Sequence, residues 1–148
     1  MIKKIISGGQ TGADRAALDV AMRLSIPHGG CIPKGRLAED GPISKKYNLQ
    51  EMPSASYPKR TKQNVVDSDG TLILSHGKLA GGSKYTKECA DKHNRPCLHI
   101  NLNTLPVNEA SLVIVDWIFK NKIEVLNVAG SRASKDSKIY EQTYHVIN

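Results

Sequence analysis

The chain has 148 residues, of which 39% are hydrophobic and 24% are charged, and its formal net charge is +7. This length suits one core and is short for two, so we expect residues 1–148 to form a single Rossmann-like ligand-binding domain. No apolar stretch approaches the roughly 18 residues of a membrane span, and the first residues lack a secretory signal. Three cysteines without a CxxC pair do not suggest a disulfide framework, so we expect a cytoplasmic protein with no membrane partner.

The positive charge favours an anionic partner. The lysines and arginines are scattered among acidic residues, and aromatic residues make up only 5% of the chain. A base-stacking platform for single-stranded nucleic acid would therefore have few side chains to use. We expect a small anionic ligand rather than nucleic acid, and a steep salt dependence of oligonucleotide binding would indicate the opposite.

Strands and helices alternate in the first half of the chain. Ile2–Ser7 is a short apolar run, and apolar residues then recur at helical spacing over 16–24. Thr61 is a plausible N-cap of a second helix, and Thr71–Leu74 is typical of a buried strand. Five of the seven prolines lie in the segment 27–58, which predicts a long ordered loop with short strands near 30–32 and 48–52.

The same alternation continues to the end of the chain. The elements predicted there are a helix after Gly81–Gly82, a strand at Cys97–Leu102, a mostly buried helix at Leu112–Phe119, a strand at Val125–Ala129, and a helix capped by Ser134 with Ile139, Tyr140, Thr143 and Tyr144 on one face. Such a pattern predicts a three-layer α/β/α, Rossmann-like fold, with a doubly wound, mainly parallel sheet and helices on both faces. Ligands of such sheets bind beyond the carboxyl ends of the strands.

Three strand ends are followed by glycine and small polar residues, at 8–15, 81–83 and 129–132. Glycine lets the backbone approach a ligand, and the free N–H groups and dipole of a following helix favour an anion such as phosphate. The first turn, GGQTGAD, is neither GxGxxG nor a P-loop. Each turn taken alone is also explained as a helix cap or tight turn, but parallel strands would bring all three to one edge of the sheet.

The residues that we expect to bind this ligand come from the three turns and from nearby polar and basic positions. They are Gly8, Gly9, Gln10, Thr11, Gly12, Asp14, Arg15, Lys34, Arg36, Arg60, Gly81, Gly82, Ser83, Thr86, Gly130, Ser131 and Arg132. Asp14 either caps the first helix or accepts a hydrogen bond from a ligand hydroxyl. Cys89, His93 and Cys97 lack a fourth ligand at suitable spacing, so we expect no metal site.

The motifs GGQTGADRAALD, PKGRLAEDGPI, YPKRTKQNVVDSDGTLIL, LAGGSKYT and NVAGSRASKDSKIY run along nearly the whole chain. Together they resemble the molybdenum carrier family, which has a Rossmann-like fold. The resemblance implies a binding protein for a phosphate-bearing nucleotide-like or pterin ligand, with the molybdenum cofactor, molybdopterin, as its cargo. One departure is Ser131, which stands where the family turn NVAGPR has a proline.

The wider superfamily includes the lysine-decarboxylase-like, or lonely-guy, phosphoribohydrolases, which implies an alternative function. Arg60 and Glu88 fall on the arginine and glutamate with which those enzymes cleave the N-glycosidic bond of a nucleoside monophosphate. However, Lys84-Tyr85 replaces the Gly-Thr of their PGGxGTxxE motif. Glu88 is equally well explained as a solvated helix carboxylate paired with a lysine four residues away. Binding is therefore our first hypothesis and hydrolysis our second.

The helix predicted over 112–119 is unusually apolar and contains Trp117 and Phe119. Domains of this kind often pair through a helical face. We therefore expect a homo-oligomer, most simply a dimer.

Overall fold

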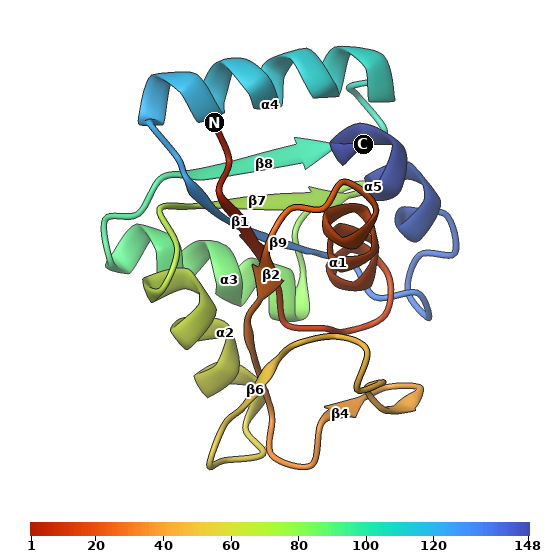
Figure 1. Cartoon of the computed structure of the whole chain (residues 1–148). Coiled ribbons are helices and arrows are strands. Elements are labelled where there is room, and N and C mark those ends of the chain that lie inside the picture. Colours follow the sequence, from red (N-terminus) through yellow and green to blue (C-terminus); the bar gives the residue numbers. More distant parts are fainter.

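The computed structural model describes all residues, 1–148, and is built around a five-stranded sheet (Figure 1). In spatial order the strands are β2 (His28–Gly29), β1 (Lys4–Ile6), β9 (Val125–Gly130), β7 (Gly70–Ser75) and β8 (Cys97–Asn101). Every neighbouring pair is parallel. All the carboxyl ends of the strands therefore lie at one edge, and the predicted parallel sheet is confirmed.

Helices cover both faces of this sheet. On one face α5 (Ile139–Ile147) packs against α1 (Ala13–Arg23) and α4 (Val107–Asn121). On the other, α2 (Tyr57–Val66) packs against α3 (Gly81–Lys92), as Figure 1 shows. Right-handed crossovers place helices on opposite faces when the chain moves in opposite directions across a sheet, so the predicted three-layer, Rossmann-like architecture is confirmed. None of the helices has the length and apolar character of a membrane span.

The apolar core lies on both sides of the sheet because the central strands are apolar throughout. All six residues of β7 are buried, and Leu72 and Leu74 belong to the main cluster with residues of α1, α4 and α5. A smaller cluster joins Val65 of α2 to Cys89 and Ala90 of α3. Strands buried on both faces are typical of parallel sheets, and the short run at 71–74 predicted such a buried strand from the sequence.

The segment between β2 and α2 forms two small strand pairs. β3 (Cys31–Ile32) pairs in parallel with β6 (Gln50–Glu51), which confirms the short strands expected near 30–32 and 48–52. β4 (Leu37–Ala38) and β5 (Gly41–Pro42) form an antiparallel hairpin. A small core joins Leu18 of α1 to four residues of this segment, Ile32, Ala38, Ile43 and Tyr47. The hairpin lies close to the turn after β1 and shapes the surroundings of the site.

Two predicted helix caps were wrong. Helix α2 begins four residues before Thr61, because the Ser56 hydroxyl accepts a hydrogen bond from the Lys59 N–H and Pro58 suits the first helical turn. Helix α5 does not begin at Ser134, whose hydroxyl instead donates to Oε2 of Glu39 at 2.5 Å. A long-range contact thus uses the side chain that local reasoning assigned to a cap.

The expectation that 112–119 is a mostly buried helix was also wrong. In α4 only Ala110 and Ile114 are buried, while Leu112 is 73% exposed and Phe119 is 69% exposed. A helix that packs on one layer buries a single stripe, and the apolar residues off that stripe remain in solvent. Helix α4 therefore presents an apolar outer face.

Candidate functional site

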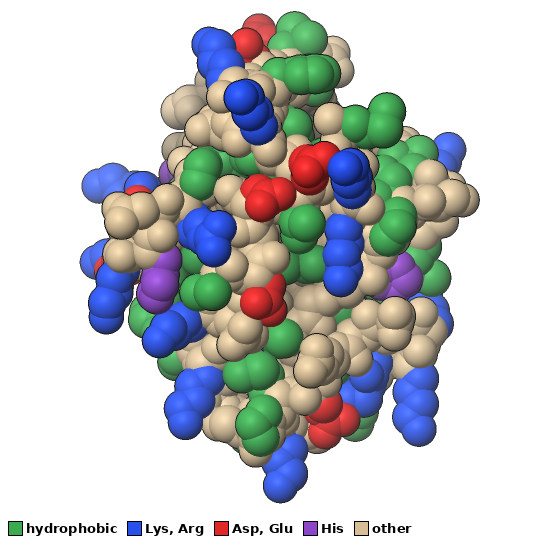
Figure 2. Space-filling model, turned by 60° about the vertical axis from the view of Figure 1, so that its left-hand side comes forward, with side chains coloured by type: hydrophobic (Ala, Val, Ile, Leu, Met, Phe, Trp, Pro, Cys, Tyr) green, Lys and Arg blue, Asp and Glu red, His purple; other side chains and the backbone are tan.

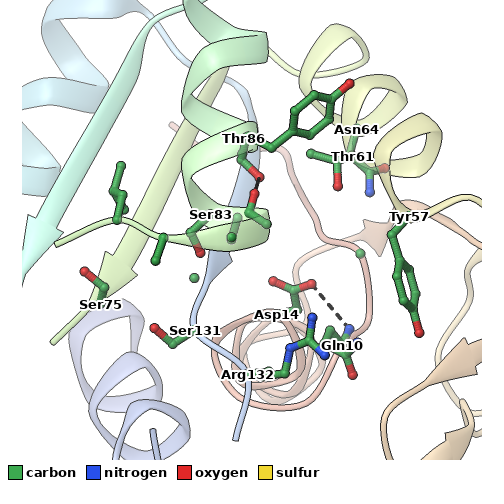
Figure 3. Close-up of a pocket in the computed structure, with 18 of the residues that line it drawn as sticks. Gln10, Asp14, Tyr57, Thr61, Asn64, Ser75, Ser83, Thr86, Ser131 and Arg132 are labelled. Atoms are coloured by element: carbon green, nitrogen blue, oxygen red, sulfur yellow. Dashed lines mark hydrogen bonds between the residues drawn. The ribbon is translucent and has the colours of Figure 1, made fainter. Parts of the chain in front are cut away.

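A cavity of about 610 Å³ opens at the carboxyl ends of β1, β7 and β9, with α2 and α3 forming part of its wall (Figure 3). All three glycine-containing turns contribute to it. The predicted residues that line it are Gly8, Gln10, Asp14, Arg60, Gly81, Gly82, Ser83, Thr86, Gly130, Ser131 and Arg132. The parallel sheet thus brings together turns that are far apart in the sequence.

The N-terminus of α3 is open to this cavity. Its N-cap residue, Ala80, has no side chain that can accept a hydrogen bond, and the N–H groups of Gly81, Gly82 and Ser83 have no partner within the protein. A Cβ atom on Gly81 or Gly82 would have no atom within 4 Å. Unpaired N–H groups at the positive end of a helix dipole are well suited to bind an anion.

The other two turns use their backbone differently from what the sequence suggested. The first N–H of α1, that of Ala13, donates to the carbonyl oxygen of Ser131 at 3.2 Å. Gly12 is needed for this contact, because its φ is +84° and a Cβ there would lie 2.3 Å from the same oxygen. Helix α5 begins only at Ile139, nine residues after Gly130. Of the three turns, only the one at Gly81 presents a free helix N-terminus.

Arg60 reaches the cavity from α2 and is buried. Its Nη1 donates to the carbonyl oxygen of Gly8 at 2.7 Å, and its guanidinium carbon lies 5.3 Å from the centre of the Tyr57 ring. Its Nε has no hydrogen-bond partner. Burial lowers the pKa of Arg60, and the nearby Asp14 opposes that shift. A buried cation with unpaired hydrogen-bond donors is unfavourable unless an anion binds to it and accepts those hydrogen bonds.

Asp14 lies in the first turn of α1 and is only 8% exposed. It is not a helix cap: its Oδ2 accepts a hydrogen bond from the Gln10 N–H, which precedes the helix, at 3.3 Å. Burial raises the pKa of this carboxyl group to about 6, although Arg60, the Gln10 N–H, Arg15 and Arg132 all favour the charged form. Figure 3 shows Asp14 beside Gln10 and Arg132, facing the side of the cavity that α3 forms.

The cavity is predominantly cationic. Four of its lining residues are basic, namely Arg60, Lys78, Arg132 and Lys135, while Asp14 is its only acidic residue. Figure 2 shows one face of the molecule, on which lysine and arginine side chains are widely spread and fewer acidic side chains lie among them. Positive charge is therefore not confined to the cavity, but within the cavity only Asp14 opposes it.

Sequence reasoning missed several of the lining residues. Lys78 and Lys135 lie in the loops that follow β7 and β9, so attention to every charge in those loops would have found them. Tyr57, Thr61 and Asn64 come from α2, and no local pattern in the sequence relates this helix to the glycine turns. The Asn64 amide is already occupied, since it exchanges two hydrogen bonds with the backbone of Cys31.

The remaining predicted residues lie outside the cavity lining: Gly9, Thr11, Gly12, Arg15, Lys34, Arg36 and Glu88. Several of them hold the loops around the site. Arg15 pairs with Asp40 of the β4–β5 hairpin at 2.6 Å, and the Thr11 hydroxyl donates to Glu39 of the same hairpin. Arg36 donates to carbonyl oxygens of the loop that follows the hairpin. Gly9 has a φ of +70° and packs against apolar side chains.

The two residues of the hydrolase hypothesis are not brought together. Arg60 is buried in the cavity, whereas Glu88 is exposed on α3 and does not line it. A carboxylate that assists glycosidic cleavage has to reach the reacting atoms directly or through one water. The arrangement of Arg60 and Glu88 does not provide this.

Together the fold and the cavity define a Rossmann-like domain with a cationic cavity at the carboxyl edge of its sheet. Residues 5–148 match the model of the circularly permutated YpsA SLOG family, and the chain belongs to this family. The crystal structure of a protein from Syntrophus aciditrophicus that is named a putative molybdenum carrier protein is similar to this structure, with a TM-score of 0.98 and 55% sequence identity. The similarity covers 99% of this chain and 92% of that chain, which agrees with the resemblance seen in the motifs. No curated protein matches the chain.

The permutation is visible in the order of the strands. If β9 is counted as the first strand, the spatial order β2-β1-β9-β7-β8 becomes 3-2-1-4-5, which is the order of the classical dinucleotide-binding fold. In that fold the strand order reverses beside the first strand, and ligands bind in the crevice at this point. Here the reversal falls between β9 and β7, and residues that follow both strands line the cavity.

Proposed function

We propose that this protein binds a small organic anion that carries a phosphate group, either nucleotide-like or a pterin. The observation that carries the proposal is the cavity itself, which combines the free N–H groups of α3 with four basic side chains, among them Arg60, whose Nη2 has no partner in the protein. Its volume of about 610 Å³ falls within the roughly 300–1,000 Å³ typical of small-molecule sites. The site at the strand reversal supports the same conclusion.

The molybdenum cofactor is the cargo that we propose, with a carrier role for the protein. The resemblance of the motifs and the name of the similar protein from Syntrophus aciditrophicus support this choice. The lining residues fit the organic part of such a ligand: the α3 N–H groups, Arg60 and Arg132 suit its phosphate, and polar residues of α2 lie nearby. Neither cysteine nor histidine lines the cavity, so the protein would hold this cargo through its phosphate and pterin.

Thermal melting with a ligand panel tests the proposal. The panel contains AMP, ADP, NAD, a pterin phosphate, molybdate and inorganic phosphate. A ligand at 100 times its dissociation constant adds about 2.7 kcal/mol of stability, which raises the melting temperature by roughly 5–11 °C in a domain of this size. The proposal is overturned if no phosphorylated compound stabilises the protein while an unphosphorylated compound or an oligonucleotide does.

Two basic residues provide a matched pair for this experiment. Arg132 lines the cavity, while Lys34 is exposed and lies outside it. Loss of a hydrogen bond to a charged group costs about 1.5–3 kcal/mol, so Arg132→Ala should weaken binding of the stabilising phosphate compound about tenfold to hundredfold. Lys34→Ala should leave it unchanged. Equal losses in both variants would indicate a general charge effect rather than a contact in the cavity.

We also propose a cytoplasmic location and a dimer. Cys31, Cys89 and Cys97 are free thiols, which is typical of proteins in reducing compartments. The proposed dimer forms through the outer face of α4, where Leu112 and Phe119 are exposed. Large apolar side chains gathered on one exposed face are characteristic of protein interfaces.

A further inference from the structure

Asp14 is out of place in a site that binds an anion. It is the only acidic residue of the cavity, and a carboxylate that is 8% exposed loses much of its hydration. The carboxylate would also repel the negative charge of a bound phosphate. The loss of hydration and the repulsion of phosphate both disfavour an aspartate at this position, which indicates that Asp14 has a specific function.

Structural roles do not account for this side chain. Asp14 does not cap α1, and the one hydrogen bond that its carboxylate accepts within the protein, from the Gln10 N–H, is long at 3.3 Å. It forms no ion pair with Arg60, although both lie against Gly8: a Cβ on that glycine would be 2.2 Å from Nη1 of Arg60 and 3.0 Å from Oδ2 of Asp14. The second oxygen, Oδ1, has no partner in the protein and is not sealed from the cavity.

A free carboxylate oxygen accepts hydrogen bonds and cannot donate them. Beside it, the Nη2 group of Arg60 has no partner in the protein and, unlike Nε, is not enclosed. The two side chains thus offer an acceptor and a donor on the same side of Gly8. A ligand that satisfies both must present a hydrogen-bond donor, such as a hydroxyl or amino group, close to its anionic group.

We propose that Asp14 makes the cavity selective for organic phosphates that carry a hydroxyl or amino donor, and that it excludes bare oxyanions such as molybdate and sulfate. This inference rests on the proposed function and adds the selectivity of the same site. Fully ionised oxyanions have no proton to donate. In the cavity they could therefore form no hydrogen bond with the Asp14 carboxylate and would be repelled by its negative charge. A site that must hydrogen-bond a donor rejects a ligand without one, because the buried acceptor is then left unpaired.

The test compares three probes at pH 8, where phosphate monoesters are fully ionised. AMP carries hydroxyl and amino donors, phenyl phosphate is an aromatic phosphate without donors, and molybdate is a bare oxyanion. We expect the wild type to bind AMP about tenfold to hundredfold more tightly than phenyl phosphate, and molybdate more weakly still. Asp14→Asn removes the charge and supplies an amide donor, so it should abolish the preference for AMP and strengthen the binding of molybdate. Glu88→Gln, which removes an exposed charge outside the cavity, should change neither.

The pH dependence gives a second readout. The charged groups that face Asp14 are Arg60, Arg15 and Arg132, and all three remain cationic between pH 5 and 8. The preference of the wild type for AMP over phenyl phosphate should therefore decline as the pH falls through about 6, where Asp14 gains its proton. Both ligands are phosphate monoesters that titrate in a similar pH range, so most of the effect of phosphate protonation cancels in the ratio. Asp14→Asn reports what does not cancel, and its ratio should vary far less than that of the wild type.

The outcomes separate this inference from the proposed function. If AMP and molybdate bind the wild type equally well, or if Asp14→Asn keeps the preference for AMP, the role of Asp14 is refuted while the anion site stands. If none of the three probes binds the wild type and the wider panel of phosphorylated ligands also fails, the proposed function falls, and the selectivity falls with it.

Discussion

Replacing Gly82 tests whether the ligand phosphate lies at the N-terminus of α3. Gly82 lies in the first turn of this helix, lines the cavity, and has open space where a Cβ would be placed. The fold should therefore accept Gly82→Ala and Gly82→Val without strain. Alanine is more favourable than glycine in a helix by up to about 1 kcal/mol, so the unliganded Gly82→Ala variant should melt at the same temperature as the wild type or a few degrees higher.

The effect on binding should have the opposite sign. A side chain at residue 82 occupies the space from which a phosphate would reach the N–H groups of residues 81–83. The wild type should gain roughly 5–11 °C at 100 times the dissociation constant of a stabilising phosphate ligand, and Gly82→Val should lose most of this gain at the same concentration. Glu88→Val, further along the same helix and outside the cavity, should keep it. A full ligand shift in a folded Gly82→Val variant would refute the placement of the phosphate at α3.

Four further outcomes follow from the contacts described above. Gly12→Ala should destabilise the unliganded protein by about 1–3 kcal/mol or more in urea unfolding, since φ there is +84° and the new Cβ meets the Ser131 carbonyl oxygen; wild-type stability would contradict this. Asp14→Asn should stabilise the unliganded protein at pH 7 by an amount on the order of 3 kcal/mol. The reason is that the pKa of Asp14 is raised from 3.8 to about 6 on folding, so the folded state holds this proton more tightly than the unfolded state. The wild type therefore loses stability as the pH rises from about 4 to 6. The difference in stability between the wild type and Asp14→Asn should vanish below pH 4. Incubation with AMP should release no adenine, because Glu88 lies outside the cavity; robust release that either Arg60→Ala or Glu88→Ala abolishes would restore the hydrolase hypothesis. Sedimentation should show a dimer that Phe119→Asp converts to a folded monomer, given that Phe119 is 69% exposed, and a monomeric wild type would refute the proposed interface.

Much of the architecture could be predicted from local sequence alone. The apolar run at 71–74 and the glycines that follow the strands are local signals, because backbone conformation and strand burial depend on neighbouring residues. Parallel strands then require their carboxyl ends to meet at one edge. For this reason the meeting of Gly8, Gly82 and Gly130 in one cavity followed from the sequence.

The three errors have different causes, two of them tertiary and one local. Ser134 has the composition of a helix cap, but its hydroxyl donates to Glu39 of a distant hairpin. The apolar residues of α4 suggested burial, yet a helix on the outer layer has only one neighbouring surface to pack against. Thr61 lost the cap position to Ser56, whose hydroxyl accepts the Lys59 N–H.

The sequence by itself determined the class of fold, the edge of the sheet where the site lies, and the positive charge that favours an anionic ligand. Only the tertiary structure decided which turn keeps its helix N–H groups free, because the carbonyl oxygen of Ser131, which follows the neighbouring strand β9, accepts the first N–H of α1. The tertiary structure also decided that Asp14 is buried near Arg60, a residue of α2 whose guanidinium group donates to the Gly8 carbonyl oxygen. Hydrogen-bond partners and burial are long-range properties, and no local spacing of residues determines them.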